Sequence, residues 1–159
     1  MKRMLLAGML LLLATSMMFA GGKAESAPGK GMVGVVMPTR SEERWNKDGA
    51  AVKSGLEALG YKVDLQFSDD DIPTQVRQIE DLITKRAQVL VIASIDGVAL
   101  SDVLAKAAEQ KIPVIAYDRL IMKSPHVDYY LSFDNYAVGQ QMGDILIKGM
   151  NLDNPAKKP

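Results

Sequence analysis

Short apolar runs alternate with stretches of helical periodicity, and this alternation is the strongest constraint on what the chain can fold into. Residues 89–93 and 113–117 are continuous apolar runs, which is typical of strands buried on both faces. Helical periodicity separates the predicted strands, and strands joined by crossover helices lie parallel with right-handed connections. The sequence therefore predicts an α/β domain with a doubly wound parallel sheet in a flavodoxin-like strand order.

The remaining elements follow the same pattern. Three further strands are predicted at residues 32–37, 63–67 and 129–133, and four helices around residues 52–59, 72–83, 100–107 and 138–149. The strand at 63–67 alternates apolar and polar residues, which favours a place near an edge of the sheet. Gly60 stands where a helix C-cap prefers glycine, and Pro73 lies in a first helical turn. We expect the five strands and four helices to close one core.

Composition excludes several classes of protein. The chain has 159 residues, which is enough for one ordinary domain, and its 19 basic and 19 acidic residues give no electrostatic surface for nucleic acid. Cysteine is absent. This excludes disulfides, thiolate metal sites, cysteine catalysis and a lipid-modified amino-terminal cysteine.

The amino terminus has the pattern of a signal peptide. Lys2 and Arg3 precede an apolar run at 4–14, and small residues favour cleavage after Ala20, with a second site near Ala24. A membrane anchor is the alternative, although the apolar run is short for a spanning helix. We therefore expect a signal peptide at 1–20. Residues 21–31 are then expected to form a flexible leader.

Polar side chains follow all five predicted strands at the points where the strands end. Asp118 and Arg119 come directly after the strand at 113–117, and together they offer acceptors beside a rigid fork of donors. Ligands of open parallel sheets bind just outside the carboxyl ends of the strands. The other candidates at this edge are Arg40, Arg44, Trp45, the aspartates 69–71, Ser94, Asp96, Asp134 and Asn135. Planar bidentate groups and an aromatic ring suit a polyhydroxylated ligand.

Each of these candidates also has a purely structural interpretation, which the sequence leaves open. Several could be helix N-caps: Asp71 for the helix at 72–83, Ser94 or Asp96 for the next helix, and Asp134 or Asn135 for the last. Trp45 could simply pack against the sheet. Asp118 and Arg119 could form a surface ion pair that closes a loop.

The candidates belong to short motifs whose order and spacing resemble a known family. The motifs are Arg44-Trp45 before Lys47-Asp48-Gly49, Gln78-Ile79-Glu80, Val89-Leu90-Val91-Ile92 before Asp96-Gly97, Ala116-Tyr117-Asp118-Arg119-Leu120, and Tyr130 with Ser132-Phe133-Asp134-Asn135 and Val138-Gly139. They resemble the periplasmic sugar-binding proteins of ABC transporters, in the branch of the xylose and multiple-sugar (galactose/glucose) receptors. The likeness runs from about Met32 to Ile147.

The resemblance implies a two-lobed protein that closes over a monosaccharide and presents it to an ABC permease in the inner membrane. The residues that motif position places at the sugar are Arg44, Trp45, Asp118, Arg119, Asp134 and Asn135. Asp118, Arg119 and Asn135 would bond sugar hydroxyls, and Arg44 would reach the ring from the loop after the first strand. The resemblance also implies a periplasmic binding protein without cofactor, metal or catalytic residues, and it allows a membrane sensor as a second partner.

Length departs from the family pattern, because these receptors have a second lobe that supplies the other half of the cleft. We expect residues 32–150 to form the N-terminal lobe of a type I periplasmic binding protein. Residues 151–159 would then begin the crossing to a second lobe that this sequence lacks. The sequence does not identify the sugar.

Two other functional classes share this kind of sheet. A hydrolase or a phosphate-accepting regulator could use the acidic residues, but the sequence has neither a Gly-x-Ser-x-Gly elbow nor a phosphate-binding glycine loop. Its single histidine, His126, stands in a predicted loop. A sugar-responsive transcription regulator would need a basic helix-turn-helix before Met32, where the predicted signal peptide lies.

Overall fold

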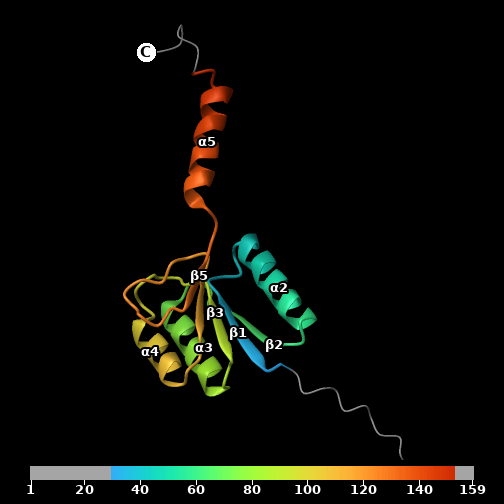
Figure 1. The fold of residues 1–159 in the computed structure, drawn as a ribbon, viewed down its shortest axis with the longest axis vertical. Coiled ribbons are helices and arrows are strands. Elements are labelled where there is room, and N and C mark those ends of the chain that lie inside the picture. Colours follow the sequence, from blue (N-terminus) through green and yellow to red (C-terminus); the bar gives the residue numbers. More distant parts are fainter. Residues whose placement is uncertain (1–29, 153–159) are drawn as a thin grey trace, which may run out of the picture.

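The computed structural model describes residues 30–152, in which strands and helices alternate along the chain (Figure 1). The elements are β1 (Met32–Met37), α2 (Glu43–Ala58), β2 (Lys62–Phe67), α3 (Ile72–Thr84), β3 (Val89–Ile92), α4 (Ser101–Glu109), β4 (Val114–Tyr117), β5 (Tyr129–Leu131) and α5 (Asn135–Gly149). The predicted signal peptide, most of the predicted leader and the last seven residues, 153–159, lie outside the described residues. The predicted alternation is confirmed.

All five strands form one sheet in the order β2-β1-β3-β4-β5, and every neighbouring pair is parallel. The predicted flavodoxin-like order is therefore confirmed, and β2 lies at an edge as its alternating pattern indicated. Because the strands are parallel, their carboxyl ends lie along one edge of the sheet. The loops that follow them are brought together there.

Helices cover the two faces of the sheet unequally (Figure 1). The face under α3 and α4 has a large buried cluster, the α3/α4 core, with Val36, Ile79, Leu82, Leu90, Ile92, Leu100, Leu104 and Val114 among its members. The other face is covered by α2 and has a smaller cluster, the α2 core, formed by Val33, Val35, Met37, Trp45, Phe67, Val91 and Ala93. The α2 helix packs mainly against β1 and β2.

Local sequence explains where the elements start, end and pack. Asp71 is the N-cap of α3, as predicted, and its carboxylate accepts a hydrogen bond from the Thr74 amide at 2.7 Å. Gly60 follows the end of α2 with φ of +90°, a conformation that glycine adopts at little cost. Gly34 in β1 leaves room for Leu82, because an added Cβ would stand 2.8 Å from that side chain.

The start of α2 differs from the prediction. Helical periodicity is evident only from Val52 onward, whereas the helix begins at Glu43. Arg44 and Trp45 therefore lie in its first turn and not in the loop after β1. The first turns of α2 are mostly charged and polar, and Trp45 and Gly49 are the buried residues that the helix contributes. The apolar signal there was too sparse to indicate a helix.

The expectation that four helices close one core is wrong. No residue of α5 is buried, and all three residues of β5 are exposed. Figure 1 shows α5 projecting from the carboxyl edge of the sheet, away from the other elements. After a short connection at 132–134, the helix continues outward instead of returning across the sheet. None of the described helices combines the length and the apolar character needed to cross a membrane.

Candidate functional site

A pocket of about 200 Å³ opens at the carboxyl edge of β4 and β5. It is lined by Tyr117, Asp118, Leu131, Ser132 and Phe133. Pockets for drug-sized ligands are typically roughly 300–1,000 Å³, so this hollow suits a smaller molecule. The pocket lies where the rule for open parallel sheets places a ligand.

Asp118 is held by its backbone at the end of β4. Its amide donates to the Leu131 carbonyl at 2.7 Å, and its carbonyl accepts from the Tyr130 hydroxyl at 3.1 Å and from Ser132 Oγ at 3.2 Å. These contacts hold Asp118 at φ of +60°, a left-handed conformation that is uncommon for a residue other than glycine. Strained backbone that several contacts enforce is typical of functional positions.

The Asp118 carboxylate is paired with Arg44, 74 residues earlier in the chain. Arg44 Nη2 donates to Asp118 Oδ1, and Arg44 Nε lies 3.5 Å from Asp48 Oδ2. The hydrogen bond to Asp118 is the main cause that raises the pKa of Arg44. The side chains of Arg44 and Asp118 are 46% and 16% exposed, so the pair is open to solvent on one side.

Trp45 lies beneath two guanidinium groups. The Arg44 guanidinium is 4.7 Å from the centre of the indole ring and the Arg119 guanidinium is 4.9 Å from it, both within cation–π range. Arg119 Nη1 also donates to the Ser94 carbonyl at 3.1 Å. Trp45 is only 1% exposed, so its packing against the sheet, the alternative that the sequence left open, is observed. Direct stacking of a ligand on Trp45 stays a prediction, and it requires a guanidinium to leave the ring.

Two buried polar atoms near Arg119 lack hydrogen-bond partners within residues 30–152. They are Trp45 Nε1 and Ser94 Oγ, both in side chains that are almost fully buried. Buried polar groups are nearly always paired, and an unpaired one calls for a water molecule or a ligand. Both atoms belong to residues that Arg119 contacts.

Tyr117 contributes a neutral hydroxyl to the pocket. Burial is the main cause that raises its pKa, and the charge of Asp48 together with a hydrogen bond to Asp48 raises it further. The phenol therefore keeps its proton throughout the neutral range. It can serve as a donor beside the carboxylates of Asp48 and Asp118.

The last two candidates stand where α5 begins. Asp134 is the N-cap of this helix, as one alternative proposed, and its Oδ1 accepts from the Ala137 amide at 2.9 Å. Asn135 is the first helical residue, and its Nδ2 lies 3.5 Å from Ser132 Oγ. Ser132 lines the pocket, so Asn135 is placed at its rim. Contact of either residue with a ligand stays a prediction.

The remaining polar residues of this edge have structural partners. Neither Ser94 nor Asp96 caps α4, because the N-cap is Leu100 and Asp96 Oδ1 accepts instead from the amides of Val98 and Ala99. The Arg40 guanidinium lies 4.1 Å from the centre of the Phe67 ring. Within residues 30–152, no cluster of three or more His, Cys, Asp or Glu side chains is placed to hold a metal ion.

Two glutamines that join α3 to the strand ends were not singled out by the sequence analysis as structural supports. Gln75 is fully buried, donates to the Ala93 carbonyl at 3.1 Å and accepts from the Ile95 amide at 3.0 Å. Gln78 donates to the Phe67 carbonyl at 2.9 Å and accepts from Ser68 Oγ at 2.7 Å. Gln75 stands on the apolar face of α3, and a polar residue at such a position is the signal that could have identified it.

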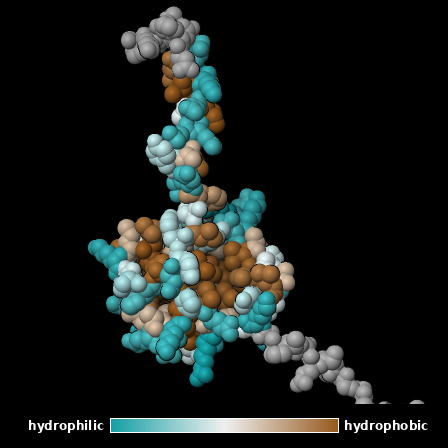
Figure 2. Space-filling model, in the orientation of Figure 1, coloured by the Kyte–Doolittle hydropathy of each residue, from teal (hydrophilic) through white to brown (hydrophobic). Residues whose placement is uncertain are grey.

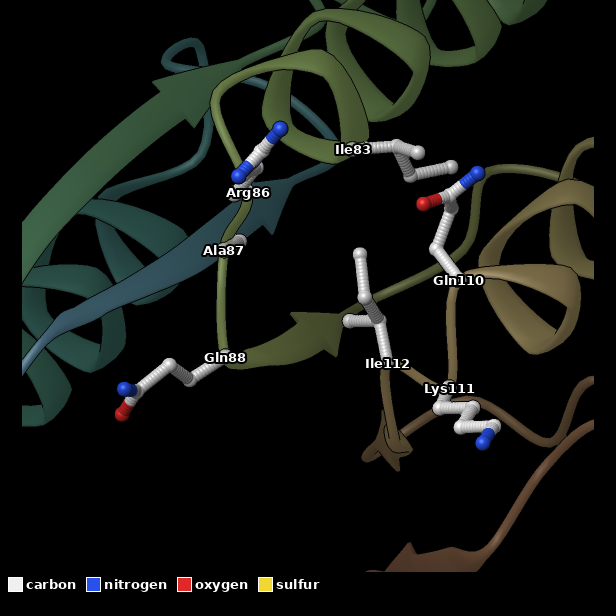
Figure 3. Close-up of a pocket in the computed structure, with 7 residues that line it drawn as sticks. All are labelled: Ile83, Arg86, Ala87, Gln88, Gln110, Lys111 and Ile112. Carbon is white, nitrogen blue, oxygen red and sulfur yellow. The ribbon is translucent and has the colours of Figure 1, made fainter.

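A larger hollow of about 400 Å³ lies at the opposite, amino edge of the sheet (Figure 3). It lies between the carboxyl-terminal end of α3 and the segment between α4 and β4, and Figure 3 shows Arg86 and Lys111 on opposite sides of it. Arg86 and Lys111 are both exposed. None of the predicted site residues lines this hollow, and ligands of such sheets bind at the other edge. We therefore assign the site to the smaller pocket.

Comparison with known proteins identifies the family of the chain. The model of the periplasmic binding protein domain matches residues 33–157. The chain is 52% identical over 126 residues to the multiple sugar-binding periplasmic receptor ChvE of Rhizobium radiobacter. This alignment covers 79% of this chain and 36% of that protein. The chain is also 35% identical over 159 residues to the D-xylose-binding periplasmic protein of Escherichia coli. That alignment covers 93% of this chain and 47% of the xylose-binding protein.

A solved structure is similar to this chain in both sequence and fold. An ABC transporter solute-binding protein from Clostridium phytofermentans with bound β-D-glucose shares 50% identity and a TM-score of 0.75, over 77% of this chain and 38% of that one. The chain thus spans less than half the length of these relatives. The two curated relatives are named for sugar binding, and the solved structure is named as an ABC transporter solute-binding protein. Because the domain model covers most of the sequence and agrees with the observed sheet, the chain belongs to the periplasmic binding protein domain family.

Proposed function

We propose that this chain binds a monosaccharide as the solute-binding component of an ABC sugar importer. The observation that carries the proposal is that Asp118, which lines the small pocket, is paired with Arg44, and that Arg44 and Arg119 lie over the same indole ring. Relatives named for multiple sugars, for xylose and for bound glucose support a sugar as the ligand. The sugar would be of the xylose, galactose or glucose type.

In this proposal each side chain has a distinct role at the sugar. The Asp118 carboxylate accepts from adjacent hydroxyls, whereas Arg44 and Arg119 donate to ring and hydroxyl oxygens. Asn135 bonds a hydroxyl from the pocket rim, with Asp134 beside it. Arg44 is already paired with Asp118, so an incoming sugar exchanges that ion pair for its own hydrogen bonds.

An exposed aromatic ring provides the apolar contact of the proposed site. Phe133 is 67% exposed and lines the pocket, with the Arg44 guanidinium 5.7 Å from the centre of its ring, so an apolar sugar face can stack on the part of the ring that stays open. Stacking on Trp45 becomes available when the sugar draws Arg44 or Arg119 off the indole ring. The unpaired Trp45 Nε1 and Ser94 Oγ could then find acceptors or water molecules at the ligand.

Titration with pentoses and hexoses tests the proposal. Trp45 is the single tryptophan of the chain, and displacement of a guanidinium from its ring should change its fluorescence. We expect saturable binding at about millimolar Kd, equivalent to about −4 kcal/mol, because the pocket contacts the sugar from one side only. Amide NMR shifts at Asp118 and Asn135 provide the check on location.

One result of the titration would count against the proposal, and another would count only against the expected weak affinity. Fluorescence and NMR shifts that do not saturate, or that acyclic polyols produce equally, would exclude a monosaccharide site. Micromolar binding by the 159-residue chain would contradict the expected weakness and show that this one edge suffices. Calorimetry distinguishes a true site from an optical artefact.

Export to the periplasm is part of the proposal, and it supplies the second prediction. The charged head, the apolar run at 4–14 and the small Ala20 favour removal of the signal peptide. Amino-terminal sequencing of exported protein should start between Gly21 and Glu25. A product that keeps Met1 and stays bound to the membrane would contradict it. In the periplasm, an inner-membrane permease and a membrane sensor are the proposed protein partners.

A further inference from the structure

Asp48 is a carboxylate that α2 places close to the pocket, although it does not line the pocket. It lies one helical turn after Arg44, and its Oδ2 is 3.5 Å from Arg44 Nε. Burial and then the charge of Asp48 raise the pKa of Tyr117, so Asp48 also lies near the end of β4. Its side chain is 26% exposed, much less than Glu43 of the same helix at 80%. Asp48 is therefore turned toward the sheet and not toward solvent.

Close packing of α2 on the sheet sets the direction in which Asp48 points. Trp45 and Gly49, one turn apart, are the buried residues of the helix. A Cβ added at Gly49 would stand 3.2 Å from a side chain of β2, so the missing side chain lets the helix lie close to the sheet. Arg44 and Asp48 each precede one of these residues and form the neighbouring row of the helix. This row faces the end of β4, and Figure 2 shows the first turns of α2 as hydrophilic surface there.

The Arg44 guanidinium lies between two carboxylates that differ in their relation to the pocket. Its Nη2 donates to Asp118, which lines the pocket, whereas its Nε faces Asp48, which does not. A sugar that bonds to Asp118 removes the main partner of Arg44. Among residues 30–152, Asp48 is the other carboxylate within ion-pair distance of Arg44. Asp48 is then the group left to hold the guanidinium.

The Tyr117 hydroxyl supports Asp48 from β4. Burial is the main cause that keeps this phenol protonated, and a protonated hydroxyl can donate to a carboxylate. Such a contact joins α2 to β4 and limits the rotation of the Asp48 side chain. Asp48 therefore stays in place when Asp118 changes partner.

We propose that Asp48 is a positioning residue of the sugar site, which holds Arg44 through Nε while the sugar replaces Arg44 at Asp118. This inference rests on the proposed function. The five N–H donors of a guanidinium form a rigid fork, so a contact at Nε fixes the direction of the Nη groups toward the pocket. Without Asp48, the sugar alone must order the long, 46% exposed side chain of Arg44, and the entropy lost in ordering it lowers the affinity.

Sugar affinity is the first measurement. Asp48→Asn keeps the shape of the side chain and removes its charge, and we expect Kd for glucose or xylose to rise about fivefold, as is typical within one charged network. Glu57→Gln is the matched control, because it breaks another ion pair of α2, with Lys53 at 3.7 Å, and should leave Kd unchanged. An unchanged Kd in Asp48→Asn, or an equal rise in the control, overturns the proposal. An unaltered chain that binds neither sugar overturns the proposed function instead.

The second measurement needs no sugar, so it decides about Asp48 whatever the titration gives. NMR follows the exchange of the Arg44 Nε–H with water in chains that carry Asp118→Asn, which removes the first carboxylate as a sugar would. Asp48 should keep this proton protected in Asp118→Asn. Adding Asp48→Asn should make the exchange much faster, whereas adding Glu57→Gln should not.

Arg119 is the reference within the same chain. Its Nη1 donates to the Ser94 carbonyl at 3.1 Å, and it has no ion pair with Asp48. Faster exchange at Arg44 alone supports the positioning role. Equal exchange in the two double variants, or faster exchange at Arg119 as well, overturns it, because Asp48 would then have no effect on Arg44 or only a general structural one.

Discussion

Replacing Asp118 with asparagine is expected to weaken monosaccharide binding about tenfold or more while barely changing the free energy of unfolding. A hydrogen bond to a charged group contributes about 1.5–3 kcal/mol, and each 1.4 kcal/mol changes Kd by a factor of ten. The variant also loses the ion pair with Arg44. Since the two side chains are 46% and 16% exposed, that pair contributes only about 0–1 kcal/mol to stability.

Asparagine is the informative substitution because of the backbone at this position. Asp118 has φ of +60°, and asparagine tolerates this left-handed conformation better than most residues. Alanine would add backbone strain of about 1–2 kcal/mol, which would confuse the loss of a ligand contact with a loss of stability. Asp102→Asn, at an exposed aspartate of α4, is the control for removing one carboxylate.

The measurements are the sugar titration for Kd and urea unfolding for stability. A Kd that stays the same in Asp118→Asn would remove the central residue of the proposed site. A large drop in stability would instead identify Asp118 as a structural residue that closes a loop, which is the alternative that the sequence left open. A loss of binding in Asp102→Asn of similar size would show that the effect is one of overall charge.

The sheet could be predicted because its signals are local. Each of β1, β3 and β4 is a continuous apolar run, and a strand buried on both faces gives this pattern whatever lies beside it. The order of strands followed from the intervening helices, since crossover connections admit few topologies. The alternating pattern of β2 correctly indicated an edge.

The internal arrangement of the site could not be predicted in the same way. The pairing of Arg44 with Asp118 joins residues 74 positions apart, and no local pattern reports it. The burial of Trp45 under two guanidiniums depends on α2, which starts nine residues before Val52, the first residue of its apolar periodicity. The outward course of α5 depends on contacts of Ser132 and Asp134, although its helical pattern was evident.

Alanine substitutions at two isoleucines on opposite faces of the sheet are expected to differ strongly in their effect on stability. Ile92 of β3 is fully buried in the α3/α4 core, and replacing a buried isoleucine with alanine lowers the free energy of unfolding by about 2–5 kcal/mol. Ile115 of β4 is only partly buried, beside the α2 core. Its replacement should lower the free energy of unfolding by about 1 kcal/mol, because solvent already reaches the site.

Urea unfolding of Ile92→Ala and Ile115→Ala measures this difference in the free energy of unfolding, with the unaltered chain as the reference. Solvent reaches Ile115 because the helices cover the two faces of the sheet unequally, so the smaller loss is expected there. Equal losses at both positions would mean that the α2 side of β4 and β5 is covered as well as the α3/α4 core, and would contradict the unequal cover of the two faces.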